Sequence, residues 1–275
     1  MPDRIEGICE MLGWTIFKHA VLQITDGLSD ALRVSLIPFI IAGAASWWLT
    51  SSYPDLSLMA LDPEMMQAGE IPPGFVNSAL GVGFLSLFLF TWVAVAWHRR
   101  TLLGEPPAGW VPPFNGGLVL GYLGRTLLLG LAIGLIMLAA GTMVAVLLYP
   151  LFGLAAQPLV SATSLFIALL LFYRLGVVLP AGAIGRRMSF GEAMRETSGH
   201  SRTAIVLALL TVGFTFLLEV PTLLDTAPDL PEGEMQAAGP ITVIYQIVVQ
   251  WIALMVGVGT LTVLYGHVVE GRPLE

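Results

Sequence analysis

Six long runs of apolar residues, separated by short polar segments, dominate the pattern along this chain. A helix needs about 20 apolar residues to cross a hydrocarbon layer roughly 30 Å thick, and each run approaches or exceeds that length. The runs are continuous rather than alternating, and lipid offers no partner for an unpaired backbone group, so they predict helices and not barrel strands. The expected membrane spans are 34–50, 76–97, 118–148, 159–183, 203–224 and 241–269.

Composition excludes a water-soluble protein. Of the 275 residues, 56% are hydrophobic and only 11% are charged, which is far too little charge to keep so much apolar surface in water. The predicted fold class is therefore an all-α polytopic integral membrane protein with one membrane domain over 1–275. Within it we expect an N-terminal amphipathic interfacial segment at 1–33, a six-helix transmembrane bundle at 34–269 and a cytoplasmic tail at 270–275.

The segment before the first span has a helical period of its own. Trp14, Phe17, Val21, Ile24 and Leu28 recur at steps of three and four residues, and polar residues fall elsewhere on the wheel. This spacing is typical of a helix that lies flat on a membrane surface with its apolar side in the lipid. We predict an amphipathic helix on the inner leaflet.

The distribution of charge predicts the orientation more firmly than the net charge of −7 does. The loops at 51–74 and 225–239 carry acidic residues and no basic ones; these are Asp55, Asp62, Glu64, Glu70, Asp225, Asp229, Glu232 and Glu234. Basic residues concentrate in cytoplasmic loops, so both termini are expected in the cytoplasm. The N-terminus lacks the features of a cleaved signal. Eleven Arg against one Lys, with abundant Ala, Gly and Pro, favour a bacterial inner membrane.

The fourth span leads into a basic loop. Arg174 lies in the cytoplasmic third of this span, where its side chain can reach the interface. Pro180 is expected to kink or end the helix. Further on, Ser189 and Glu192 have the spacing of a capping box, which predicts a short amphipathic helix in the loop.

A weak internal repeat suggests three tandem helical hairpins. Arg33, Arg125 and Arg202 each stand at the cytoplasmic start of an outgoing helix, each after a surface-lying segment. The third span also carries Gly130 and Gly134 at the spacing that lets two helices approach closely. We expect this face to pack within the chain in preference to forming a dimer.

Four stretches carry a resemblance to a known family, namely LRVSLIPFIIAG, AWHRRTLLGEPP, FYRLGVVLPAGAIGRRMSFGEAMRETSG and YGHVVEGRP. They resemble the uncharacterised six-helix bacterial inner-membrane proteins of the YciC type. They are also similar to the membrane domain attached to some glycerophosphodiester phosphodiesterases. The resemblance covers nearly the whole chain and implies the hairpin bundle, but it implies no activity. The chain has no room for the catalytic barrel of such an enzyme.

No motif in the chain indicates an enzyme. Nucleotide loops, paired cysteines and zinc-protease motifs are missing from the sequence. The four histidines, His19, His98, His200 and His267, have no ligand spacing, and we expect them to be interfacial residues at helix ends. We therefore predict no catalytic residue, no metal site, no cofactor and no nucleic-acid partner.

Two sets of polar residues are candidate sites. The first is a basic inner surface that would contact anionic lipid headgroups or a membrane-protein partner; its residues are Arg99, Arg100, Arg186, Arg187, Arg195 and Arg202. The second lies within the spans, where polar groups are costly and often functional; its residues are Arg125, Arg174, Gln246 and Gln250.

These sets support two functions. A non-enzymatic scaffold or accessory protein would use the basic surface to hold lipids or a partner. A small transporter or lipid-handling protein would instead have a cavity near Arg174. The spans offer too few donors and acceptors for a hydrophilic path, which favours the scaffold, although an apolar solute or lipid escapes that objection.

Overall fold

A computed structural model describes residues 2–53, 71–107, 109–224 and 240–274 of the chain. In these residues the chain is helical and contains no strand. All eight acidic residues of the two predicted outer loops lie outside the described residues. The long helices are α1 (Pro2–Asp26), α2 (Leu28–Ser52), α5 (Phe75–Leu103), α6 (Gly116–Phe152), α7 (Gln157–Leu175), α10 (Ser201–Leu224) and α11 (Pro240–Val268). Short helices are η1 (Gly153–Ala156), α8 (Val178–Ala183), α9 (Phe190–Glu196) and η2 (Ser198–His200).

In the part of the chain that the structure describes, five helical segments are long and apolar enough to cross a membrane. They are Leu28–Ser52, Phe75–Leu103, Gly116–Phe152, Ser198–Leu218 and Ile244–Val268. The fourth predicted span, 159–183, is shorter than expected, because the apolar helix here covers only Leu159–Leu175. The described residues are thus consistent with an all-α membrane protein, with five candidate spans and one shorter apolar helix.

The fourth predicted span breaks four residues before its proline. Pro180 has no N–H to donate, and in a continuous helix its ring would clash with the carbonyl of Gly176. That carbonyl instead accepts a hydrogen bond from Leu179 N–H at 2.8 Å, and α8 begins at Val178. Gly185, at φ +82°, ends α8, where Arg186 N–H donates to Ala181 C=O.

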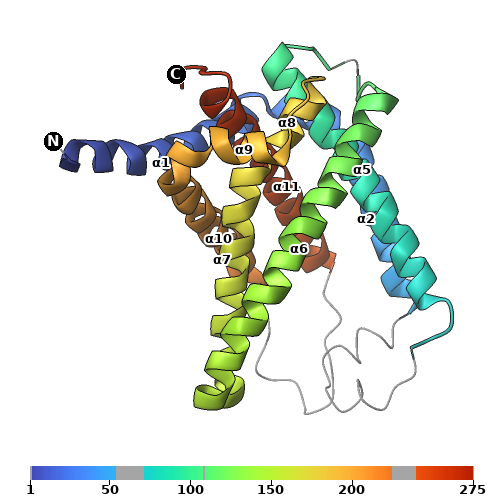
Figure 1. Cartoon of the computed structure of the whole chain (residues 1–275). Coiled ribbons are helices and arrows are strands. Elements are labelled where there is room, and N and C mark those ends of the chain that lie inside the picture. Colours follow the sequence, from blue (N-terminus) through green and yellow to red (C-terminus); the bar gives the residue numbers. More distant parts are fainter. Residues whose placement is uncertain (1, 54–70, 108, 225–239, 275) are drawn as a thin grey trace.

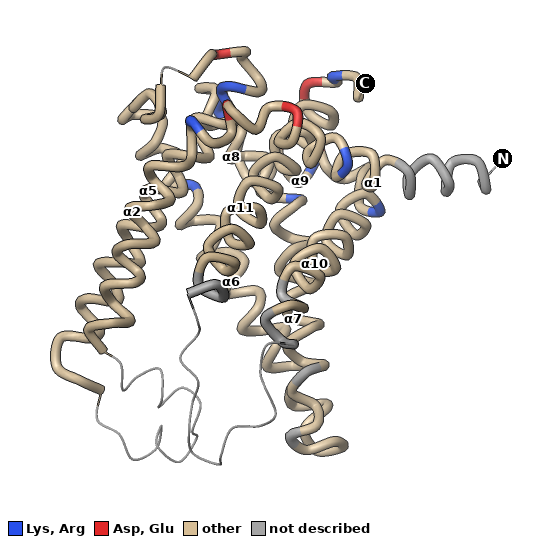
Figure 2. Tube along the Cα trace, turned by 180° about the vertical axis from the view of Figure 1, so that it is seen from behind, with Lys and Arg blue, Asp and Glu red and all other residues tan. Residues whose placement is uncertain are grey.

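Charged residues gather at one end of the bundle, called here the charged end. Figure 2 shows that the Lys, Arg, Asp and Glu residues it colours lie at this end. The described parts of both termini lie near the same end, and α1 runs across it (Figure 1). The apolar remainder of the bundle has the surface that a hydrocarbon layer requires.

The side of α1 that is buried differs from the predicted stripe. Ile16, Phe17, Ala20 and Ile24 are buried, whereas Trp14 is 53% exposed. The buried residues face α10 and α11, both of which pack against α1. Backbones approach closely here, because a Cβ on Gly13 would lie 2.7 Å from Val206 of α10. Helix α1 is therefore an integral part of the bundle.

The helices pair unequally. Helix α2 packs on α5, and α6 packs on α7. Helix α10 instead packs mainly on α7 and α1, so α1 takes much of the place that α11 would have in a third hairpin. The expected packing of Gly130 and Gly134 within the chain is not seen in the described residues, since a Cβ on either would meet no atom within 4 Å.

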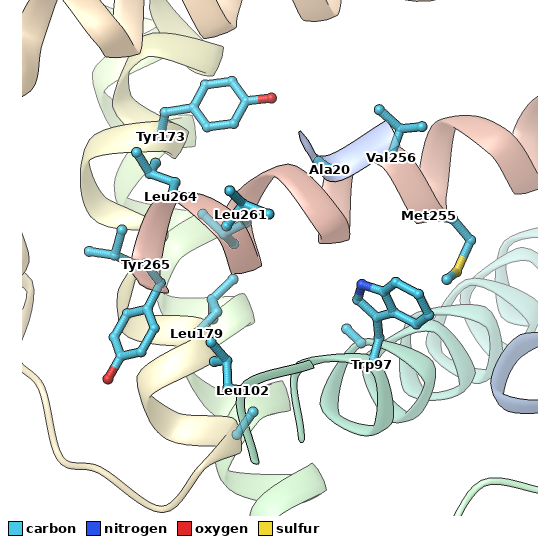
Figure 3. Close-up of a cluster of buried hydrophobic side chains, with 14 of the residues drawn as sticks. Ala20, Trp97, Leu102, Tyr173, Leu179, Met255, Val256, Leu261, Leu264 and Tyr265 are labelled. Carbon is cyan, nitrogen blue, oxygen red and sulfur yellow. The ribbon is translucent and has the colours of Figure 1, made fainter. Parts of the chain in front are cut away.

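The core lies toward the charged end and is organised around α11. Trp97 of α5, Tyr173 of α7 and Leu179 of α8 are buried together with Leu261 and Tyr265 of α11. Figure 3 shows these side chains around the last turns of α11. All six residues of α8 are buried as well, so the broken fourth span fills the centre of this end.

Candidate functional site

Exposed arginines follow one another along the segment from α8 to α10. Arg186 and Arg187 come directly after the turn that ends α8, and Arg195 lies in the last turn of α9. Arg202, in the first turn of α10, is also exposed and has an interaction within the chain. These four residues form what we call the basic face.

A capping box holds the short helix α9, as the sequence predicts. Glu192 N–H donates to Ser189 Oγ at 3.2 Å, and Ser189 N–H donates to Glu192 Oε2 at 2.7 Å. These hydrogen bonds to the carboxylate, first from the Ser189 backbone and then from its hydroxyl, lower the pKa of Glu192, and nearby Arg195 and Arg186 add to the effect. The segment between the arginines therefore has a defined conformation.

Two other arginines of the predicted basic surface are engaged in ion pairs. Arg99 pairs with Glu105, with Nε 2.8 Å from Oε2, and also donates to the Ala183 carbonyl at 3.1 Å. Arg100 donates twice to Asp30 Oδ2, at 2.6 and 2.9 Å. The first set joins α5 to the end of α8, and the second joins α5 to α2. Their charges are thus partly neutralised within the fold.

Arg174 connects α7 to α9. Its Nη2 donates to the Met194 carbonyl at 3.4 Å, and its own carbonyl accepts a hydrogen bond from Thr197 Oγ1 at 3.2 Å. The Nε atom is buried and has no hydrogen-bond partner in the described chain. Arg174 therefore lies under the basic face, half-buried, and holds α9 against the bundle.

The four predicted intramembrane polar residues do not come together. The Arg125 guanidinium covers Gly182 of α8, where a Cβ would lie 2.5 Å from Nη1, whereas Arg174 contacts α9. Gln246 and Gln250 lie toward the other end of α11, about 33 and 27 Å from its last residue at 1.5 Å per residue. None of the four lines the apolar groove between α2 and α11 or the smaller pockets at the end of α5 and along α6.

A buried histidine joins three spans, and the expectation that His98 is interfacial is wrong. His98 is 0% exposed; its Nδ1 lies 2.7 Å from Thr262 Oγ1 and its Nε2 lies 3.1 Å from Tyr122 O–H. Thr262 donates its only hydroxyl hydrogen to the Val258 carbonyl at 2.7 Å. His98 Nδ1–H must therefore donate to Thr262, and Nε2 accepts from Tyr122. The neutral imidazole is fully satisfied between α5, α6 and α11.

Sequence reasoning missed this cluster although a signal for it existed. His98, Tyr122 and Thr262 are polar residues at the ends of three apolar runs, and a buried polar group needs a hydrogen-bond partner. Such residues at one depth in several spans are candidates for mutual contact. The cluster is structural, because neither nitrogen of His98 is left for a metal or a proton transfer.

The remaining histidines do not form a ligand set. His267 Nδ1 lies 2.8 Å from the Arg272 carbonyl and fixes the chain after α11, while His200 Nδ1 is buried without a hydrogen bond. His19 has an interaction within the chain. Wherever the structure describes residues, no three His, Cys, Asp or Glu side chains lie close enough to hold a metal ion.

Comparisons with known proteins assign no family to this chain. No family model, no curated protein and no solved structure matches the chain. The resemblance to YciC-type membrane proteins therefore stays a prediction. The described residues form helices and no strand, and the long apolar helices among them are suited to a membrane.

Proposed function

We propose that this chain is a non-enzymatic scaffold or accessory protein of a bacterial inner membrane, and that its basic face binds anionic groups. The ligand chemistry is that of a lipid phosphate or of carboxylates on a membrane-protein partner. The observation that carries the proposal is the exposure of Arg186, Arg187 and Arg195 on one conformationally defined segment, while Arg99 and Arg100 are paired with carboxylates.

The proposed orientation has six crossings and both termini in the cytoplasm. Five crossings would leave the termini on opposite sides, but both lie near the charged end (Figure 1). Counting α7 as the fourth crossing, with α8 and α9 after it at the inner surface, accounts for this arrangement. The basic face would then meet the inner leaflet, whose anionic headgroups attract each basic residue by about 1 kcal/mol.

Native mass spectrometry of the intact protein, purified in mild detergent, tests the proposal. The wild type should retain an anionic lipid or a protein partner. The triple variant Arg186→Gln, Arg187→Gln and Arg195→Gln should lose it, because the charge that attracts the ligand is removed. The triple lysine variant at the same positions should retain most of the binding, since it keeps the charge.

The outcomes separate the alternatives. Loss of lipid alone assigns the face to headgroups, and loss of a protein alone assigns it to a partner. Retention of every bound species by the glutamine variant contradicts the proposal. A transport role would require a path that passes Arg174, and Arg174→Gln would then alter uptake into proteoliposomes without altering what is retained at the basic face.

A further inference from the structure

A long apolar groove lies between α2 and α11, two helices that contain no residue of the basic face. Its volume is about 920 Å³, within the range that small-molecule sites commonly have. Helix α2 lines it from Leu28 to Trp47, and α11 lines it from Ile244 to Trp251. At 1.5 Å per residue the lining of α2 is about 28 Å long, close to the thickness of a hydrocarbon layer.

The groove offers no free polar group to a ligand along its inner part. The indole N–H of Trp251 donates to Ser35 Oγ at 2.7 Å, and Ser35 in turn donates to the Ala31 carbonyl at 2.6 Å. These bonds fasten α11 to α2 and satisfy the polar atoms at the bottom of the groove. Phe39, which is buried against Phe90 of α5, completes that bottom. A hydrophilic solute would lose its hydrogen bonds to water and find no partner at the bottom of the groove. An alkyl chain has no such hydrogen bonds to lose.

A cation without a partner stands beside the end of the groove that is nearest to the charged end. Arg33 follows Leu32, which lines the groove, and its side chain is exposed. No ion pair or hydrogen bond involves this side chain within the described ranges. The neighbouring Asp30 does not neutralise Arg33, because Asp30 is paired with Arg100. The guanidinium of Arg33 is therefore available to pair with an anionic group at this end of the groove.

We infer that the groove between α2 and α11 is a binding site for one anionic glycerophospholipid of the leaflet next to the charged end. The acyl chain lies along Leu36, Ile40 and Gly43, and the phosphate meets Arg33. A membrane supplies such a molecule in excess, and it matches both the apolar length and the single charge of the site. This lipid would be held by the fold, independently of the headgroups proposed for the basic face.

The test is native mass spectrometry of the full chain, titrated in detergent with phosphatidylglycerol or with phosphatidylcholine of the same acyl chains. We expect one phosphatidylglycerol to bind in preference to phosphatidylcholine. Arg33→Gln should weaken the binding of phosphatidylglycerol about fivefold, because this factor corresponds to the loss of about 1 kcal/mol per basic residue. Phosphatidylcholine should bind Arg33→Gln and the wild type alike.

Filling the groove should remove the site. A Cβ on Gly43 meets no atom within 4 Å, so Gly43→Trp can occupy the groove without displacing the core, and we expect it to lower binding of both lipids at least tenfold. Gly83→Trp on α5 is the matched control, because its surroundings are equally open. It should bind lipid as the wild type does, and equal melting temperatures would show that both variants fold.

Four outcomes overturn the inference. Unchanged binding by Gly43→Trp would place the lipid elsewhere. If the two lipids bind equally and Arg33→Gln has no effect, the groove is an apolar surface that does not recognise the headgroup. Retention of a second copy or another protein, released by Gly43→Trp, would make the groove a helix-docking surface. Loss of the lipid in the triple glutamine variant of the basic face, with Gly43→Trp unaffected, would assign the lipid to that face instead.

Discussion

The imidazole Nδ1 of His98 and the hydroxyl of Thr262 are 2.7 Å apart, although 164 residues separate them in the chain. The hydrogen bond joins α5 to α11 inside the core, and Tyr122 of α6 takes the other nitrogen of the ring. Three spans are thus held in register by one neutral side chain. Because the cluster is buried, removing any one of its members should cost more stability than the sum of its separate hydrogen bonds suggests.

Removal of the Thr262 hydroxyl should destabilise the bundle. Thr262→Val keeps the shape of the side chain but leaves His98 Nδ1–H buried without an acceptor, which costs about 1–3 kcal/mol. The free energy of unfolding in detergent, from a denaturant titration, measures the effect. The same substitution at Thr260 is the control, because Thr260 is equally buried and its hydroxyl has no hydrogen bond to lose. Equal destabilisation by both variants would show that the hydrogen bond to His98 contributes nothing.

Gly13 should tolerate no side chain. A Cβ there would lie 2.7 Å from Val206 Cβ and Cγ1, so Gly13→Ala forces α1 away from α10 and should lower stability by about 1–3 kcal/mol. Thermal unfolding of the purified variants measures this. Gly134→Ala on α6 is the control, since its Cβ enters open space; its stability should stay level or rise by up to about 1 kcal/mol. A large loss of stability on Gly134→Ala would instead indicate that a second copy packs on that face of α6.

The pair Arg100 and Asp30 should couple weakly but measurably. The side chain of Arg100 is 36% exposed and that of Asp30 is 23% exposed, so solvent screens the pair and we expect a coupling energy of about 0.2–1 kcal/mol. A double-mutant cycle with Asp30→Asn and Arg100→Gln gives this energy directly. Additive effects of the two substitutions would mean that the ion pair does not contribute to holding α2 on α5.

Glu192 should titrate below the ordinary glutamate pKa. Its folded pKa is lowered by the Ser189 hydrogen bonds, so its contribution to α9 is present above the unfolded pKa and is lost as pH falls through the folded one. A side-chain NMR titration of the labelled protein measures the midpoint. Ser189→Ala should move that midpoint upward, toward the ordinary value. Ser198→Ala should not, because the hydroxyl of Ser198 donates to Arg195 C=O and not to Glu192. A midpoint at the ordinary value in the wild type would contradict the capping box.

Local sequence signals predicted the helices and the caps well. The second predicted span, 76–97, is found as Phe75–Leu103, and the sixth, 241–269, is found as Pro240–Val268. Both rest on runs of apolar residues, which determine helix length directly in a membrane protein. The capping box at Ser189 was equally predictable, because its two members lie three residues apart.

Contacts between segments that are far apart in the sequence could not be predicted from such local signals. Arg100 looks like part of a basic surface in sequence, yet its partner Asp30 lies 70 residues earlier. His98 looks interfacial because His-Arg-Arg ends an apolar run, yet α6 and α11 cover it. Gly130 and Gly134 have the right spacing for close packing, but nothing in a single sequence says whether a second helix lies over them.

The length of α6 has a consequence for the bilayer itself. Its 37 residues extend about 55 Å, while a hydrocarbon layer is roughly 30 Å thick, and Leu147 and Leu151 near its far end are still apolar and exposed. Such a helix must lean strongly, or the surrounding lipids must stretch to cover it, at a cost of a fraction of a kcal/mol for each Å of mismatch. The protein should therefore partition into the thicker patches of a heterogeneous membrane and thicken the lipid shell around α6.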